Sequence, residues 1–443
     1  MSSKKKTTAT KEDGKAALVP KLRFPEFRDA DGWEYSPLGK LLMKSPDYGV
    51  NAAAVPFNEM LPKYLRITDI SEDGTYLSDK KVSVDLEPTE EIYLDEGDIV
   101  LARTGASVGK SYRYRKEDGR LVFAGFLIRV KPNPKRLEPT YLANFLTTEQ
   151  YWKWVAATSA RSGQPGINSV EYSSLAIPLP AEFPEQQKIA ECLSSVDASV
   201  AAQARKVDAL KTHKKGLMQQ LFPREGETQP RLRFPEFQNA AEWEDGELGP
   251  KTNKVGSGIT PTGGDKNYKQ AGRPFVRSQN VGWGILLLDE IAYIDEATHA
   301  SFDSTEIKVT DVLLNITGAS IGRSAVSDER IVRGNVNQHV CIIRVKPDEL
   351  NPFFLNQFLI SQRGQKQIDS FQAGGNRQGL NFAQIRSFAI PLPPKLPEQQ
   401  RIADCLTSLD DLIAAETQKL AGLKTHKKGL MQQLFPSPDE VQA

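Results

Sequence analysis

The sequence predicts a mixed α/β (α+β) protein in which two mainly β modules are separated by two long helices that form an antiparallel coiled coil. Three observations support this prediction. Segment 176–223 recurs at 389–436 with a constant offset of 213 residues, and its last part, 210–223, is identical to 423–436. Both copies have the apolar spacing of a long helix. Each half of the chain also opens with Leu-Arg-Phe-Pro-Glu-Phe. A period this long indicates a duplicated domain with its connector rather than a solenoid.

The repeated segment has the heptad spacing of a coiled-coil helix. Pro184 and Pro397 fit the first helical turn, where a missing N–H is tolerated, and Pro223 and Pro436 follow the last apolar residues. Such a narrow apolar stripe needs a cover. We therefore expect the helices to pack on each other and to bind partner subunits through Ile189, Leu193, Val196, Val200, Leu210, Leu217, Ile402, Leu406, Leu409, Ile413, Leu423 and Leu430. Polar residues that would fix the register interrupt the stripe at Gln203, Lys214, Glu416 and Lys427.

Composition is that of an ordinary globular protein. The 443 residues, 39% hydrophobic and 26% charged, suffice for about two to four domains. The formal net charge is +1, so a basic surface for nucleic acid would have to be local. Three cysteines are too few for a disulfide framework, and we expect them to be small buried residues in a reducing compartment. No apolar signal segment or membrane-length run is present in the sequence, which predicts a cytoplasmic protein.

Repetition of the opening and of the helix sets the predicted boundaries. They are a disordered tail at 1–20, a first module at 21–180, a first long helix at 181–223, a linker at 224–230, a second module at 231–393, a second long helix at 394–436 and a tail at 437–443. Inside the modules, buried strand-like runs precede Thr-Gly-Ala-Ser turns at 104–107 and 317–320. Glycine-rich polar loops follow at 159–168 and 372–381.

Three features suggest catalysis without meeting its requirements. The segment 104–111 lacks the first glycine of a phosphate-binding loop, and its copy replaces the lysine with Arg323, so we interpret both as a strand followed by a glycine turn. Asn-Pro-Phe-Phe at 351–354 resembles an amino-methyltransferase signature but lacks the second proline; an N-cap asparagine before a helix-starting proline explains it. The four histidines lack metal-ligand spacing. The sequence therefore predicts no catalytic residue and no metal site.

Polar and basic loop residues are the candidates for a nucleic-acid surface. Lys and Arg neutralise phosphates, and Arg, Asn and Gln can pair bidentately with guanine or adenine, although each lysine can equally be a solvated surface charge. The first module offers Arg66, Arg103, Thr104, Lys110, Arg113, Arg161, Gln164 and Asn168. The second offers Arg277, Asn280, Thr317, Arg323, Arg333, Gln338, Asn376, Arg377, Gln378 and Asn381.

The two helices barely differ, whereas the two modules differ at most positions. This contrast is expected if both helices bind the same partner surface while the modules recognise different targets. Antiparallel pairing would relate the halves by an approximate two-fold axis, which duplex DNA shares.

The alternation of module and helix resembles the specificity subunit of a type I restriction-modification system. The resemblance rests on the two openings, the Thr-Gly-Ala-Ser turns, the Arg-Val-Lys-Pro strands and the Pro-Glu-Gln-Gln-(Lys/Arg)-Ile-Ala helix entries, and covers nearly the whole chain after residue 20. It implies two target recognition domains that each read one part of a bipartite, asymmetric site in double-stranded DNA. It further implies that the helices set the spacing and dock two modification (methyltransferase) subunits, which restriction subunits join.

The same resemblance implies a subunit without catalysis or cofactor of its own. S-adenosylmethionine, ATP and Mg would act on the partner subunits. Two alternatives remain open from the residues alone. One is a scaffold whose modules bind proteins or glycans, which weak salt dependence of binding would reveal. The other is a stand-alone nuclease or methyltransferase, which would turn over substrate without partners.

Overall fold

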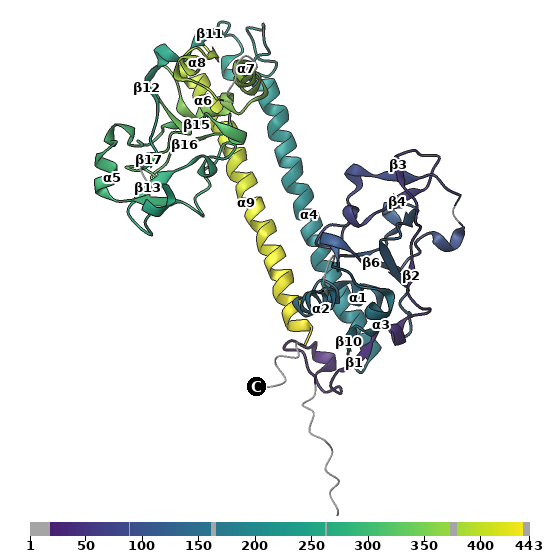
Figure 1. Ribbon diagram of the computed structural model, residues 1–443. Coiled ribbons are helices and arrows are strands. Elements are labelled where there is room, and N and C mark those ends of the chain that lie inside the picture. The colour runs from purple at the N-terminus through teal and green to yellow at the C-terminus, as the bar shows by residue number, and fades with distance from the viewer. Residues whose placement is uncertain (1–17, 88, 161–164, 262–263, 373–378, 437–443) are drawn as a thin grey trace, which may run out of the picture. The chain divides into compact units, whose positions relative to one another are not determined.

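The computed structural model describes residues 18–436 except 88, 161–164, 262–263 and 373–378 (Figure 1). The chain divides into two compact units, one of Met1–Ala202 with Leu420–Ala443 and one of Gln203–Lys419. Each unit contains one module together with parts of both long helices. This division differs from the predicted one, in which the boundaries fall at the helix ends.

The described residues of the first module form three sheets. An antiparallel sheet has the order β2 (Asp47–Tyr48), β9 (Leu127–Val130), β6 (Ile99–Ala102) and β7 (Ser111–Arg113). A second sheet has the order β3 (Ala54–Pro56), β5 (Val82–Val84), β4 (Lys63–Leu65) and β8 (Leu121–Phe123), with β4 and β8 parallel. The opening strand β1 (Glu34–Pro37) pairs with β10 (Ala176–Leu179). The helices are α1 (Pro139–Phe145), α2 (Glu149–Ser159) and α3 (Ser169–Ser174).

The second module repeats this plan. Its main sheet has the order β12 (Thr252–Ser257), β18 (Val340–Val345), β15 (Val312–Asn315) and β16 (Ser324–Val326). A three-stranded sheet has the order β14 (Ala292–Ile294), β13 (Arg273–Val276) and β17 (Asn335–Val336), and β11 (Glu244–Glu247) pairs with β19 (Ala389–Leu392). Its helices are α5 (Glu296–Ala300), α6 (Pro352–Leu359), α7 (Gln362–Gln372) and α8 (Phe382–Arg386).

Strand β6 is apolar at every position because it is buried on both faces. All four of its residues are buried. Ile99 and Leu101 belong to the core that the helices share, whereas Val100 and Ala102 belong to a second core on the opposite side. The main sheet is therefore a central layer covered on both faces, and successive side chains alternate between two cores. Strand β15 divides its residues between two cores in the same way.

The Arg-Val-Lys-Pro segments form strands in both modules, as predicted, but in registers that differ by two residues. Ile99 pairs with Val130, whereas its counterpart Val312 pairs with Ile343. A shift of two residues keeps each side chain on its original face. The fully buried Arg129 lies 3.5 Å from Asp98, and Arg344 lies 2.7 Å from Asp311, the counterpart of Asp98.

The two long helices are α4 (Phe183–Leu221, teal) and α9 (Leu396–Leu434, yellow), inside the predicted ranges 181–223 and 394–436 (Figure 1). Within the second unit, the Gln203 amide contacts Glu416, and Lys214, further along α4, contacts Asp410, which comes earlier in α9. The two segments therefore run in opposite directions. In the first unit, Lys427 of α9 pairs with Asp197 of α4 at 2.6 Å.

Four of the twelve helix residues predicted to bind partners are core residues of their own unit. Ile189 and Leu193 pack in the core of the first module, and Ile402 and Leu406 pack in that of the second. All four are 2% exposed or less, so they are not available to another chain. The heptad pattern correctly identified an apolar helix face. It did not show whether that face packs against a module of the same chain or against a partner protein.

The predicted tail at 1–20 and the linker at 224–230 each contain a residue that contacts the opening of a module, whereas residues 1–17 and the predicted tail at 437–443 lie outside the described residues. Leu18 is buried, and its carbonyl accepts the Trp33 N–H at 2.7 Å. In the linker, the Thr228 carbonyl accepts the Trp243 N–H at 2.8 Å. Leu18 and Thr228 thus hold equivalent places beside the opening of each module. Among the described residues, no helix has both the length and the apolar character needed to cross a membrane.

Candidate nucleic-acid interface

In the first module, the glycine turn after β6 holds the polar loop against the end of the strand. The Gly105 N–H donates to the Pro165 carbonyl at 3.1 Å, and the Ile167 N–H donates to the Arg103 carbonyl at 2.9 Å. Gly105 has a φ of 70° and Gly109 a φ of 87°, and a Cβ on Gly109 would lie 2.7 Å from the Val155 side chain. These positions require glycine. The interpretation of this segment as a strand followed by a glycine turn is confirmed.

An exposed aromatic and cationic group lies beside this turn. The Arg103 guanidinium lies 4.9 Å from the ring centre of Tyr48, and the Arg103 N–H donates to the Phe126 carbonyl at 3.0 Å. Tyr48 is 44% exposed and Phe126 is 56% exposed. The Tyr48 hydroxyl lies 3.2 Å from Ser169 Oγ and accepts the Ser169 backbone N–H at 3.2 Å. These hydrogen bonds with Ser169 and the nearby Arg103 lower the pKa of the hydroxyl. An open ring beside a cation suits contact with a base or a phosphate.

The corresponding place in the second module carries hydrogen-bonding side chains. The Ile316 N–H donates to the His339 carbonyl at 3.0 Å, which repeats the Arg103 to Phe126 bond. His339 Nδ1 lies 2.5 Å from Thr317 Oγ1, and His339 Nε2 lies 3.0 Å from Gln338 Nε2. Gln338 also accepts a hydrogen bond from the Thr260 hydroxyl. Thr317 forms an isolated bridge with Gly379, as Thr104 does with Gly166.

The structure therefore brings together Arg103 and Thr104 in one module and Thr317 and Gln338 in the other. Sequence reasoning missed Tyr48, Phe126, Thr260 and His339. Tyr48 could not be assigned because it joins Arg103 from a distant strand, and no local pattern indicates that Phe126, directly before an apolar strand, is exposed.

Three predicted asparagines have structural roles instead. Asn168 and Asn381 are the N-caps of α3 and α8, and both form capping boxes. Asn280 is 1% exposed; it accepts the Arg277 N–H at 3.0 Å and donates to the Leu287 carbonyl at 2.9 Å. The side-chain oxygens of these three residues are thus engaged by the backbone, which gives each side chain a structural role.

The other predicted residues lie apart from this group or outside the described residues. Arg66 is paired with Asp69 at 2.8 Å, and the Arg277 side chain donates to the Glu290 carbonyl at 2.9 Å. Arg333 holds a φ of 61°, and its carbonyl accepts from Arg273. Lys110, Arg113 and Arg323 lie at or beside β7 and β16, which follow the glycine turns. Outside the described residues lie Arg161, Gln164, Asn376, Arg377 and Gln378.

The features that suggested catalysis are structural where the chain is described. Asn351 caps α6, which begins at Pro352, and its side chain accepts the Phe354 N–H at 3.0 Å. The predicted N-cap explanation is confirmed. Among the described residues, no group of three or more His, Cys, Asp or Glu side chains could hold a metal ion.

A family model described as the type I restriction modification DNA specificity domain matches residues 37–212 and 256–425, one match in each half of the chain. The chain belongs to this family. It is a specificity subunit of a type I restriction-modification system, and such subunits recognise DNA sequence without catalysing a reaction.

Two curated specificity subunits of Methanocaldococcus jannaschii are similar to this one. The putative MjaX subunit is 25% identical over 346 residues, which cover 76% of this chain and 77% of the relative. The MjaVIII subunit is 23% identical over 433 residues, which cover 94% and 93%.

Two solved structures share the fold of this specificity subunit. A crystal structure of a type I S subunit from M. genitalium has a TM-score of 0.62 and 15% identity, covering 95% of this chain and all (100%) of the other. A chain from a study of assembly and conformational transition of a type I system has a TM-score of 0.52 and 18% identity, covering 92% and 98%. The predicted mixed α+β fold with two recognition domains is confirmed.

Proposed function

We propose that each module of this specificity subunit reads one part of a bipartite, asymmetric DNA site. In this proposal α4 and α9 form a continuous antiparallel coiled coil that sets the gap and docks two modification subunits. The observation that carries the proposal is a pair of surfaces at equivalent places on one scaffold, bearing different chemistry.

The equivalence follows from backbone pairing. Tyr48 pairs with Ile128 in the first module, and Ser257 pairs with Cys341 in the second. Ile128 and Cys341 in turn pair with Leu101 and Leu314, the equivalent residues of the strands that precede the glycine turns. Arg103 and Phe126 correspond to Ile316 and His339 through their shared backbone hydrogen bond. A cationic, aromatic surface in one module thus stands where the other has a polar, hydrogen-bonding surface.

These two surfaces suit different base edges. An apolar ring can contact the methyl group of thymine, and an arginine can pair with guanine, whereas histidine, glutamine and threonine offer hydrogen bonds to several bases. Two such readers on one chain favour two unlike half-sites, which makes the whole site asymmetric. The opposite running directions of α4 and α9 within the second unit, together with the Lys427 to Asp197 contact in the first, support the two-fold arrangement that the proposal requires.

The chemistry of the complex is assigned to other chains. Methyl transfer from S-adenosylmethionine and ATP- and Mg-dependent translocation and cleavage would belong to the modification and restriction subunits. The role of this subunit is to place them on the correct DNA.

Salt dependence provides the test that separates this proposal from a protein-binding scaffold. DNA affinity of the assembled complex is measured between about 50 and 200 mM salt, with a target duplex and a shuffled duplex of equal length. Phosphate-dominated binding should weaken steeply with salt, and the target should be preferred at every concentration. Binding that is insensitive to salt and to sequence would contradict the proposal.

A further inference from the structure

One arginine holds the same place in a short turn of each module. Arg66 follows β4 and Arg277 follows β13, two strands that each pair in parallel with a later strand of their module. Both arginines have a φ of −110°. In each turn the side chain three residues further on accepts the backbone N–H of the arginine, Asp69 at 2.9 Å and Asn280 at 3.0 Å. The two turns are therefore equivalent, and they differ in whether this acceptor carries a charge.

The charge of the acceptor decides whether the arginine is neutralised. Asp69 binds the Arg66 guanidinium through both carboxylate oxygens, at 3.0 Å from Nε and 2.8 Å from Nη2. Asn280 offers no such charge. Within the described part of the chain Arg277 forms no ion pair, and its Nη2 donates to the Glu290 carbonyl at 2.9 Å. An amide in place of a carboxylate thus leaves the arginine of the second module with an uncompensated charge.

The surroundings of Arg277 fix its guanidinium without neutralising it. The guanidinium carbon lies 5.1 Å from the ring centre of Tyr268, and Nε is buried without a hydrogen-bond partner among the described residues. Arg103 of the first module has the same two features, with the Tyr48 ring at 4.9 Å. A planar guanidinium held on a ring loses little freedom when it binds a phosphate. Such an arginine, half-buried and without a counter-ion, favours an anion from outside the chain.

The turn of Arg277 is attached to the two strands that lead to the proposed reading surface. The Asn337 N–H donates at 3.0 Å to the carbonyl of the residue before Arg277, and Gln338 follows Asn337 directly. The Asn315 amide donates at 2.8 Å to the carbonyl of the residue after Arg277, and Thr317 comes two residues after Asn315. Arg277 thus lies apart from the candidate base contacts but is tied to their strands, as expected of a contact to the DNA backbone.

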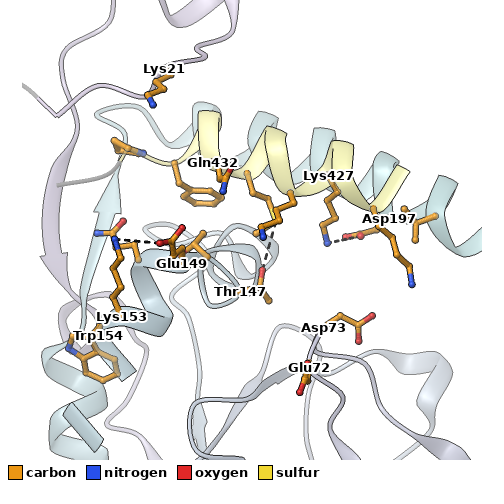
Figure 2. A pocket seen from close by; sticks show the side chains of 18 residues that line it. Lys21, Glu72, Asp73, Thr147, Glu149, Lys153, Trp154, Asp197, Lys427 and Gln432 are labelled. Atoms are coloured by element: carbon orange, nitrogen blue, oxygen red, sulfur yellow. Dashed lines mark hydrogen bonds and ion pairs between the residues drawn. The ribbon is translucent and has the colours of Figure 1, made fainter. Parts of the chain in front are cut away.

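The hairpin that follows each turn differs in charge in the same sense. An isolated bridge closes both hairpins. The hairpin of the first module carries Glu72 and Asp73, which are exposed and line a cavity of that unit (Figure 2). The hairpin of the second module carries the exposed Trp283 and Gly284 instead. Two carboxylates repel a phosphate, whereas an indole ring and a glycine do not. The second module is therefore the one that suits a phosphate beside this turn.

We propose that Arg277 binds a phosphate of the DNA backbone beside the half-site that the second module reads. Asn280 is the positioning residue that leaves the guanidinium available, whereas Asp69 occupies Arg66 in the first module. This contact rests on the proposed function, in which each module binds one half-site. It makes the backbone contacts of the two half-sites unequal, because only one module binds a phosphate at this turn.

The test removes phosphate charges one at a time from the target duplex by methylphosphonate substitution. The affinity of the complete complex, with its modification subunits, is measured for each duplex. At one position, beside a single half-site, the substitution should weaken wild-type binding by about tenfold. Arg277→Met should bind the unmodified duplex about tenfold more weakly and should be insensitive to that position. Its slope of log affinity against log salt should be smaller by about one. Arg277→Lys should keep the sensitivity and the slope.

Asn280→Asp tests the positioning role, because it restores the carboxylate that the first module has. Its affinity and salt slope should match those of Arg277→Met. The Asn280 amide also donates to the Leu287 carbonyl at 2.9 Å, so Asn280→Ala, which loses that bond without adding a charge, is the matched control and should keep the wild-type slope. In the first module the double variant Arg66→Met with Asp69→Asn leaves the net charge unchanged, and affinity and slope should stay at wild type.

Two results would overturn the phosphate contact while leaving the proposed function intact. One is that every methylphosphonate position affects wild type and Arg277→Met equally. The other is that Arg277→Met weakens binding only to duplexes with one particular base pair, which would make Arg277 a base contact. A wild-type salt slope in Asn280→Asp would overturn the role of Asn280. A wild-type complex that is insensitive to both salt and sequence would overturn the proposed function as well.

Discussion

Lys214 of α4 donates to both carboxylate oxygens of Asp410 of α9, at 2.6 and 2.7 Å. The Gln357 amide of α6 donates to the same carboxylate at 2.8 Å, so the pair joins both helices to the second module. The copy of this pair in the first unit, Lys427 with Asp197, has the same 2.6 Å separation but is more exposed.

This difference in exposure predicts unequal costs for the same substitution. Lys214→Met should lower the free energy of unfolding of its unit by about 2–4 kcal/mol, because it leaves a largely buried carboxylate without its cation. Lys427→Met, in the exposed copy, should cost about 1 kcal/mol or less. Chemical denaturation of the two variants measures both, and equal costs would show that burial does not govern this pair.

A substitution in one module should weaken recognition of one half-site only. Phe126→Ala should weaken binding to one half-site by about 1–3 kcal/mol, and His339→Ala should do so for the other, if each side chain contacts a base. Affinities for duplexes altered in one half-site at a time provide the measurement. If both variants affect both half-sites equally, the residues act on the fold or on phosphates rather than on bases.

Asn168 and Asn381 should behave as helix caps rather than as base contacts. Replacement by Ala should cost about 1 kcal/mol of stability, and replacement by Ser or Asp, which also cap, should restore most of it. Selectivity between duplexes should be unchanged. A loss of selectivity without a loss of thermal stability would instead support these residues as base contacts.

The three cysteines should react at different rates. Burial raises the pKa of the Cys341 thiol to about 12, and Cys341 is fully buried. Cys192 and Cys405 are only partly buried, which corrects the prediction that all three are buried. At pH 8, alkylation followed by mass spectrometry should label Cys192 and Cys405 first and Cys341 only on unfolding, because the thiolate is the reactive form. Rapid labelling of Cys341 in the native protein would contradict its burial.

Features set by local sequence were predictable. Proline and heptad spacing placed the ends of α4 and α9 within about two residues, because helix boundaries depend on nearby residues. The same applies to the Asn351 cap and to the glycine turns.

Features set by strand register were not predictable. Matching the Arg-Val-Lys-Pro motifs suggested equivalent positions, yet the registers differ by two residues because pairing follows the whole sheet. Tyr48 meets Arg103 only through the β2 to β9 to β6 order. The heptad spacing correctly placed Leu193 on the apolar face of α4, but the spacing alone does not show which surface packs against that face.

The central claim is that two unlike readers on one chain contact two separated parts of a duplex. Footprinting of the complex of this chain with its modification subunits, at single-nucleotide resolution on the target duplex, tests it most directly. Two protected segments with different sequences, separated by a gap in which base changes leave affinity unaltered, are the predicted result. One continuous protected segment in which every base matters would contradict the account.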